Sequence, residues 1–193
     1  MCSEHCEDYN ISFVSIDDIA AAQKATQYLI STGRRKIAMM NSSTQFKYAR
    51  HREKGFRLAL EEAQIIPNED WILHLSTMSY GLAMANAMHI LSQPDRPDAI
   101  FAASDVYAIG VIKAAHKLGL NVPDDLAVVG FDNIEISTMT EPSITTIKQP
   151  SRQIGFQSCE LLVEQIVNPN ADPRQITLET ELIVRDSTPL NYN

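Results

Sequence analysis

The sequence predicts an α/β fold built on a doubly wound parallel sheet. First, short apolar segments typical of buried strands alternate with helical segments from residue 11 to residue 130. Second, the loops between these segments are short, as they are in parallel sheets whose two faces are covered by helices. Third, the chain has 193 residues, 45% hydrophobic and 21% charged, which suffices for one ordinary domain or two small lobes.

The expected elements follow one another in strand–helix order. Gly33 and Pro67 end two of the helices, because glycine and proline are favoured just beyond a helix. The strands are expected at ISFVSID (11–17), KIAMMN (36–41), WILHL (71–75), AIFAAS (99–104) and LAVVG (126–130). The helices are expected at DIAAAQKATQYLIST (18–32), ARHREKGFRLALEEAQI (49–65), YGLAMANAMHILSQ (80–93) and VYAIGVIKAAHKLG (106–119).

The pattern changes after residue 140. The segment PSITTIKQP, residues 142–150, is extended and bounded by prolines. Residues 175–188 alternate apolar and polar side chains, which predicts an antiparallel or edge strand. Between them, residues 152–167 are expected to form an amphipathic helix whose apolar positions include Ile154, Leu161, Leu162 and Ile166.

Composition excludes several classes of protein. The net charge of -8 argues against this chain holding nucleic acid by itself, since such binding neutralises phosphates with basic residues. No apolar run approaches the ~20 residues of a membrane-spanning helix, and the acidic first residues do not resemble a signal peptide. Three widely spaced cysteines are unlike a disulfide framework, so the expected compartment is a reducing cytoplasm.

Neither a metal site nor a catalytic centre is predicted. Cys2, His5 and Cys6 lie close together, but structural zinc needs four ligands, so incidental thiols near a chain end are the preferred interpretation. The sequence carries no phosphate-binding glycine motif and no nucleophile elbow, and its histidines fall on separate elements. We therefore expect no cofactor and no enzymatic activity.

Polar residues follow four of the expected strands. The strand 36–41 leads into NSSTQFKYARHR, and the strand 71–75 leads into STMS. Ser104 and Asp105 end the next strand, and Asp132 and Asn133 follow the strand 126–130. Because loops after parallel strands emerge at one edge of the sheet, these loops are expected to converge on a single cleft.

Arg52 and Asp132 are the principal candidates for this cleft. A guanidinium fork in the first turn of the helix 49–65 can bind neighbouring hydroxyls, and a carboxylate supplies acceptors for the same kind of ligand. Phe46 and Tyr48 would offer flat faces to a sugar ring or a base. For Arg50 a solvated charge is preferred, and Asp132 could instead cap a helix or form a turn.

Four segments carry a resemblance to a known family: VSIDDIAAAQKATQYLISTGRRKIAMMNS, ARHREKGFRLALEE, PDAIFAASDVYAIGVIKAAHKLGLNVPDDLAVVGFDN and PSITTIKQP. In this order, and over residues 11–188, they resemble the effector-binding core of LacI/GalR-type bacterial transcription regulators. The resemblance implies a periplasmic-binding-protein-like fold of type I, with two α/β lobes and a ligand in the cleft between them. In this family, a helix-turn-helix and a hinge helix at the N-terminus bind the operator as a dimer.

The resemblance also assigns site residues. Arg52 looks like the cleft arginine of the family, Asp132 like its cleft aspartate, and Ser104 occupies a polar cleft position. Ser76 aligns where several members place an aromatic platform, which weakens any expectation of ring stacking there. The remaining candidates are Phe46 and Tyr48, in a loop that varies with effector, and Asp17 and Gln149, second-line contacts at the inter-lobe crossovers.

Compared with the family, the chain is expected to be a fragment containing mainly the C-terminal lobe. Residues 1–12 would be a remnant of the N-terminal lobe and 13–142 the C-terminal effector-binding lobe. Residues 143–170 would be a crossover with an N-lobe helix, and 171–193 a return strand and tail. The helix 152–167 then lacks its usual partner, and the fragment should not bind operator DNA.

The helix 106–118 is expected to take part in dimerisation. Its main apolar arc would cover the sheet, whereas Val106 and Ile109 fall within the opposite, polar arc. Single apolar residues on a surface are also normal in monomers. The resemblance favours an interface, since this helix contributes to the subunit contact in such regulators, and it places Val106 and Ile109 near a two-fold axis.

The leading hypothesis is the ligand-sensing and dimerising part of a cytoplasmic transcription regulator. Its effector would be a small polar molecule, a sugar or a nucleoside-like compound. The alternative is a periplasmic sugar-binding protein for transport, which shares the fold. A doubly wound enzyme is third, because the sequence offers no nucleophile, phosphate loop or metal set.

Overall fold

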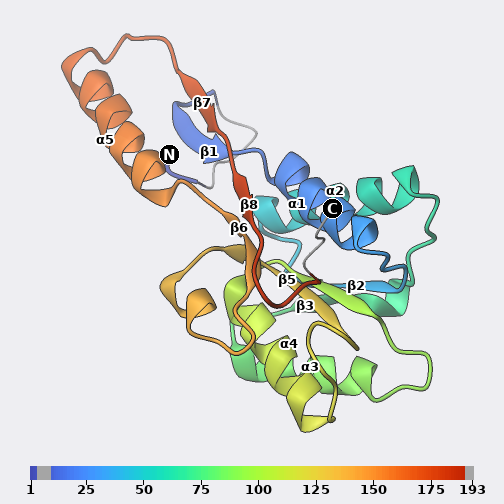
Figure 1. Ribbon diagram of the computed structural model, residues 1–193. Coiled ribbons are helices and arrows are strands. Elements are labelled where there is room, and N and C mark those ends of the chain that lie inside the picture. The colour runs from blue at the N-terminus through green and yellow to red at the C-terminus, as the bar shows by residue number, and fades with distance from the viewer. Residues whose placement is uncertain (4–9, 190–193) are drawn as a thin grey trace. The chain divides into compact units, whose positions relative to one another are not determined.

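The computed structural model describes residues 1–3 and 10–189, and they form two compact units (Figure 1). The large unit comprises Asp18–Lys148 and Glu181–Asn193. The small unit comprises Met1–Asp17 and Gln149–Thr180. In the part of the chain that the structure describes, no helix is both long and apolar enough to cross a bilayer.

A six-stranded sheet forms the centre of the large unit, in the order β3-β2-β4-β5-β6-β8. The first five strands are parallel, and β8 pairs antiparallel with β6 at the edge. Every residue of β2 and β4 is buried, as expected of parallel strands covered on both faces. The strands are β2 (Ile37–Ser42), β3 (Ile72–Leu75), β4 (Ala99–Ala102), β5 (Ala127–Asp132), β6 (Thr145–Lys148) and β8 (Glu181–Ile183).

Two helix pairs cover the two faces of this sheet, which confirms the doubly wound α/β fold (Figure 1). On one face, α3 packs against α4, over side chains that alternate along the strands, such as Ala38 and Met40 of β2. On the other face, α1 packs against α2. The helices are α1 (Asp18–Ser31), α2 (Lys47–Glu62), α3 (Tyr80–Leu91) and α4 (Asp105–Lys117), with short 3-10 turns at Glu69–Trp71 and Glu135–Thr138.

The antiparallel edge strand expected over residues 175–188 is confirmed for β8 only, because the segment forms two strands in two different sheets. In the small unit, β7 (Gln175–Leu178) pairs parallel with β1 (Phe13–Ile16), whereas β8 joins the large sheet. The alternating pattern predicts extended backbone correctly. It does not indicate the partner of each half, because both halves expose one face.

The division into units also differs from the boundaries expected after residues 12, 142 and 170. Since β1 pairs with β7, residues 13–17 lie in the small unit, and the chain leaves that unit between Asp17 and Asp18. Likewise β6 belongs to the large sheet, so the crossing falls after Lys148.

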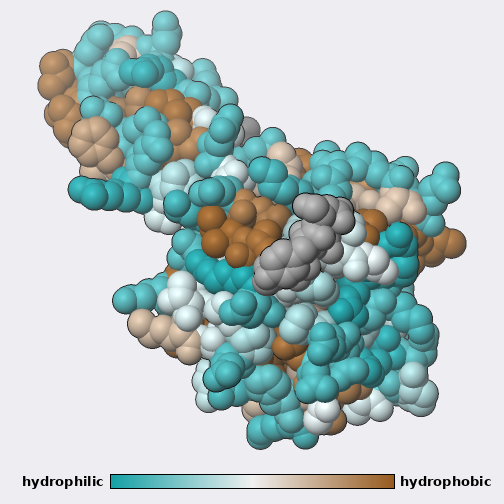
Figure 2. Space-filling view, in the orientation of Figure 1, coloured by the Kyte–Doolittle hydropathy of each residue, from teal (hydrophilic) through white to brown (hydrophobic). Residues whose placement is uncertain are grey.

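The helix α5 (Ser151–Val167) packs against β1 in the small unit and matches the helix expected from residue 152. Of its predicted apolar positions, Ile154 and Leu161 are buried. Leu162 and Ile166, however, are 61% and 68% exposed. Figure 2 shows hydrophobic residues at the surface of the small unit.

Candidate functional site

Arg52 is held inside the large unit by hydrogen bonds to two other segments of the chain. Its Nε donates to Oδ1 of Asp18 at 2.8 Å, and its Nη1 donates to the carbonyl oxygen of Ala103 at 2.7 Å. Arg52 and Asp18 are both almost fully buried, which makes this a buried ion pair. The helix α2 begins at Lys47, two residues earlier than expected, so Arg52 lies in its second turn rather than its first.

Aromatic rings line the guanidinium of Arg52. Its Cζ lies 3.5 Å from the ring centroid of Phe131 and 5.0 Å from that of Tyr48. Tyr48 in turn stacks on Phe46 with a centroid distance of 5.6 Å, and Phe46 is 43% exposed. These contacts place flat apolar faces and a cation side by side. That Phe46 and Tyr48 offer these faces to an effector stays a prediction. Sequence analysis missed Phe131, although it directly precedes Asp132.

Asp132 and Ser104 are hydrogen-bonded to each other at the carboxyl edge of the sheet. The Ser104 hydroxyl donates to Oδ2 of Asp132 at 3.2 Å and also accepts from the Val106 amide, which caps α4. Asp132 is the last residue of β5 and has φ of 109°, so the chain turns at the residue that carries the carboxylate. Phe131, the residue before Asp132, contacts the Arg52 guanidinium. Ala103, the residue before Ser104, accepts a hydrogen bond from the same guanidinium. Arg52, Ser104 and Asp132 therefore lie in one region.

Asp105 is a buried carboxylate in this region that sequence analysis did not assign to the site. The pKa of Asp105 is raised to about 6, mainly by burial and also by the charge of Asp132. Hydrogen bonds from the Thr146 hydroxyl and the Ile134 amide act in the opposite direction, because they favour the charged carboxylate. Its place beside Ser104 at a strand end is the only signal in the sequence.

The other candidates lie on other segments of the chain. Ser76 is exposed and follows β3. Asp17 and Gln149 belong to the small unit. Asp17 is the residue at which the chain first leaves this unit, and Gln149 is the residue at which it returns. On α4, Val106 and Ile109 are partly exposed, and Ile109 also packs against the core of the large unit.

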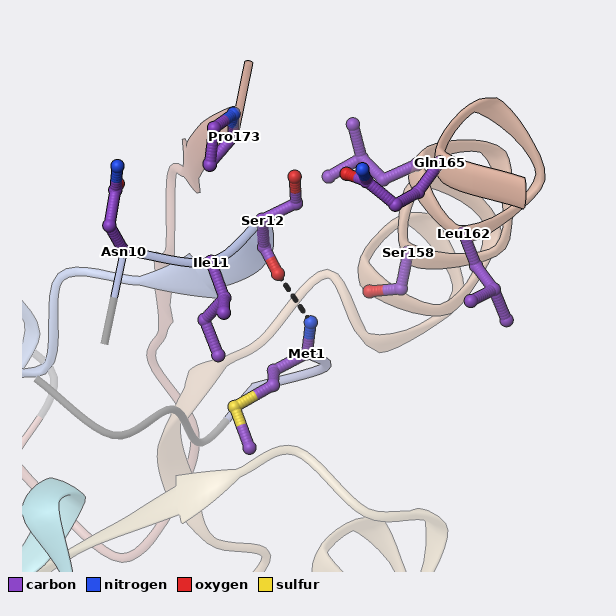
Figure 3. A pocket seen from close by; sticks show the side chains of 9 residues that line it. Met1, Asn10, Ile11, Ser12, Ser158, Leu162, Gln165 and Pro173 are labelled. Carbon is purple, nitrogen blue, oxygen red and sulfur yellow. Dashed lines mark hydrogen bonds between the residues drawn. The ribbon is translucent and has the colours of Figure 1, made fainter. Parts of the chain in front are cut away.

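A hollow of about 390 Å³ lies in the small unit (Figure 3). Its lining is mainly apolar and comes from α5 and the N-terminal segment. The described residues contain no group of three potential metal ligands, and the described cysteines, Cys2 and Cys159, are free thiols. His5 and Cys6 lie outside the described residues, so the interpretation of that group as incidental thiols stays a prediction.

Comparison with known proteins identifies the family. Residues 26–188 match the periplasmic binding protein-like domain. The chain belongs to this family. The proteins similar to it include transcriptional repressors and LacI-type regulators, as the resemblance implied.

One relative of this periplasmic binding protein-like domain is the HTH-type transcriptional repressor PurR of Vibrio vulnificus, 38% identical over 84% of this chain and 48% of the repressor. The chain thus spans about half the length of the curated relatives it matches. A solved complex of the regulator CelR with cellobiose has a TM-score of 0.87 and 33% identity, covering 92% of this chain and 54% of that one. A LacI family regulator from Enterococcus faecium with bound ribose has a TM-score of 0.82 and 28% identity, covering 92% and 65%.

Proposed function

We propose that this chain is the ligand-sensing and dimerising part of a LacI/GalR-type DNA-binding transcriptional regulator. Its effector would be a sugar or a nucleoside-like compound, bound without chemical conversion in a cleft between two lobes. The large unit would supply the C-terminal lobe, and the small unit would be part of the other. The names of the relatives, which are repressors and regulators, favour this role over sugar transport in the periplasm.

The observation that carries the proposal is the cluster of Arg52, Phe131 and Asp132. The bonds to Asp18 and Ala103 use two of the five N–H donors of a guanidinium, which leaves donors for a ligand. The Asp132 carboxylate supplies acceptors a short distance away along β5. Donors and acceptors beside aromatic rings suit a ligand with several hydroxyl groups on a flat ring.

The remaining candidates complete this proposal. Ser104 would add a hydroxyl that is already oriented by Asp132 and by the start of α4. Tyr48 and Phe46 would contact the ring of the effector, and Ser76 would contribute a polar group. Asp17 and Gln149 would act as second-line contacts at the crossovers between lobes.

The proposed function also includes dimerisation and DNA binding by the intact protein. A symmetric homodimer would form through α4, and a helix-turn-helix outside these 193 residues would contact operator DNA in the cytoplasm. The net charge of -8 agrees with a division of labour in which this part senses the ligand and another part contacts phosphates.

The test is titration calorimetry of the intact protein with ribose, cellobiose and adenosine. Arg52→Ala should reduce the binding free energy of the compound that the wild type binds by about 1.5–3 kcal/mol, the scale of a charged hydrogen bond. Arg52→Lys keeps the charge beside Asp18 but loses the fork, so it should weaken binding while the fold is kept.

The matched control is Arg57→Lys, on the same helix, because Arg57 pairs with Glu53 and Glu69 at the surface. It should leave effector affinity unchanged. Equal affinity in the Arg52 and Arg57 variants would contradict the assignment of Arg52, and no binding of any compound by the wild type would contradict the choice of effector class.

A further inference from the structure

The turn that carries Asp132 has an unusual backbone. Asp132 has φ of 109° and the next residue, Asn133, has φ of 56°. Positive φ is rare for residues other than glycine, and the value at Asp132 lies outside the usual left-handed region. Two such residues in succession persist only where their surroundings fix them. The turn after β5 must therefore be held by other parts of the large unit.

Asp105 holds this turn from the start of α4. It is fully buried, and its Oδ2 accepts a hydrogen bond from the Ile134 amide at 2.9 Å. Its Oδ1 accepts from the Thr146 hydroxyl at 2.6 Å. Gly130 leaves the space for this carboxylate, because a Cβ at that position would lie 2.3 Å from Oδ1 of Asp105.

Thr146 and Arg185 hold the same turn from two further elements. The Thr146 hydroxyl on β6 accepts from the Asn133 amide at 3.3 Å, so one oxygen joins the turn to Asp105. From the segment after β8, Nη2 of Arg185 donates to Oδ1 of Asn133 at 2.6 Å. Its Nη1 donates to the carbonyl oxygen of Ile144 at 2.7 Å, which fixes the guanidinium.

We propose that Asp105, Thr146 and Arg185 form a clamp of positioning residues that fixes the Asp132 carboxylate in the orientation that receives the effector. This inference rests on the proposed function, in which Asp132 contacts the ligand. The three side chains act on the turn immediately after Asp132, through the amides of Asn133 and Ile134 and the side chain of Asn133. None of them needs to touch the effector.

The charge of Asp105 supports a dedicated role. A carboxylate enclosed in protein is unfavourable, and burial raises the pKa of Asp105 accordingly. The charged groups that act on it are Asp132, which raises this pKa, and Arg185, which lowers it. A neutral side chain of similar size at this first position of α4 would avoid the penalty. The negative charge instead strengthens the bonds that hold the turn.

Amide hydrogen exchange tests the clamp without any ligand. In Thr146→Val, the Asn133 amide should exchange about tenfold faster than in the wild type, the effect of its one lost hydrogen bond. The Ile134 amide should also exchange faster, because its acceptor Asp105 loses the bond from Thr146. Thr26→Val is the matched control, because Thr26 is also fully buried and its hydroxyl bonds the carbonyl oxygen of Ala22 within α1. It should leave the two amides protected.

Calorimetry with ribose, cellobiose and adenosine then tests positioning. Thr146→Val should lower the affinity for the compound that the wild type binds about tenfold, and Asp105→Ala should lower it further. Asp105→Asn should recover part of the affinity, because the asparagine oxygen can still accept from the Ile134 amide. In an Asp132→Asn background, Thr146→Val should have no additional effect.

The outcomes separate the two proposals. Unchanged exchange at Asn133 and Ile134 in Thr146→Val would overturn the clamp whether or not a ligand binds. Faster exchange with full effector affinity would show that the turn is held for structure alone and would also overturn it. A wild type that binds none of the three compounds would contradict the proposed effector class, and the exchange result would still decide whether the clamp exists.

Discussion

At the scale of single residues, the carboxyl group of Asp105 links the fold to pH. Its pKa in the folded protein is raised to about 6, from 3.8, mainly by burial. Between about pH 4 and pH 6 the folded state retains a proton that the unfolded chain has released. The contribution of Asp105 to the free energy of unfolding therefore falls as the pH rises through this window and is constant above it.

Asp105→Asn should remove this dependence. From the pKa shift, the wild type loses about 3 kcal/mol of stability between pH 4 and pH 7 through this group alone. Urea unfolding of both proteins across this range measures the difference, and subtracting the two curves cancels the other carboxylates. A difference between variant and wild type that stays constant with pH would contradict the raised pKa.

The residues of the candidate site were predictable to different degrees. Strand ends in a parallel sheet share one edge, so the pattern alone indicated that Arg52, Ser104 and Asp132 would gather there. The ion pair between Arg52 and Asp18 was not predictable, because the partners lie 34 residues apart and belong to different helices. Arg185 lies after the last strand, where no local pattern distinguishes it from any solvated arginine.

At the scale of elements, α4 combines two surfaces. Tyr107, Val111, Ala114 and Ala115 are buried against the sheet and α3, as the apolar arc predicts, and Lys113 and Lys117 are exposed. Ile109 is partly exposed and keeps part of its side chain against the core. An interface at Val106 and Ile109 stays a prediction, which a single charge can test.

Ile109→Asp should convert a dimer of the intact protein into a monomer, because an unpaired carboxylate would be buried at the two-fold axis. Sedimentation velocity measures the change. Ile66→Asp is the control: Ile66 is 92% exposed, between α2 and β3, and its replacement should leave the dimer intact. A dimer that persists in Ile109→Asp, with an unchanged melting temperature, would exclude α4 from the interface.

Strand and helix positions followed from the sequence more closely than strand partners did. Most expected helices begin and end within two or three residues of those found, because hydrophobic period and end signals are local. The division of residues 175–188 between β7 and β8 depends on long-range pairing with β1 and β6. Alternation in that segment is equally compatible with either partner.

At the scale of the whole molecule, α5 leaves an apolar surface exposed. Phe156, Leu162, Val163 and Ile166 are each more than half exposed, close to the hollow of the small unit. Exposed apolar residues that are grouped in this way mark a surface able to bind apolar molecules.

The double variant Leu162→Lys/Ile166→Lys should lose most of the fluorescence that the dye ANS gains on binding the wild-type chain. The reason is that two charged side chains would interrupt the apolar surface of α5. Ile66→Lys, which changes an isolated exposed isoleucine of the large unit, should retain that fluorescence. Equal fluorescence in the double variant and the wild type would place the dye elsewhere.

The pairing of β1 with β7 has a consequence for how the protein is made. Phe13 lies opposite Gln175, so β1 leaves the ribosome about 160 residues before its partner strand β7 does. Sheet partners so distant in sequence pair slowly, because closing the long intervening loop has a high entropic cost. During synthesis the segment Asp18–Lys148 of the large unit emerges between these two strands, so β1 can pair only after β7 has also left the ribosome.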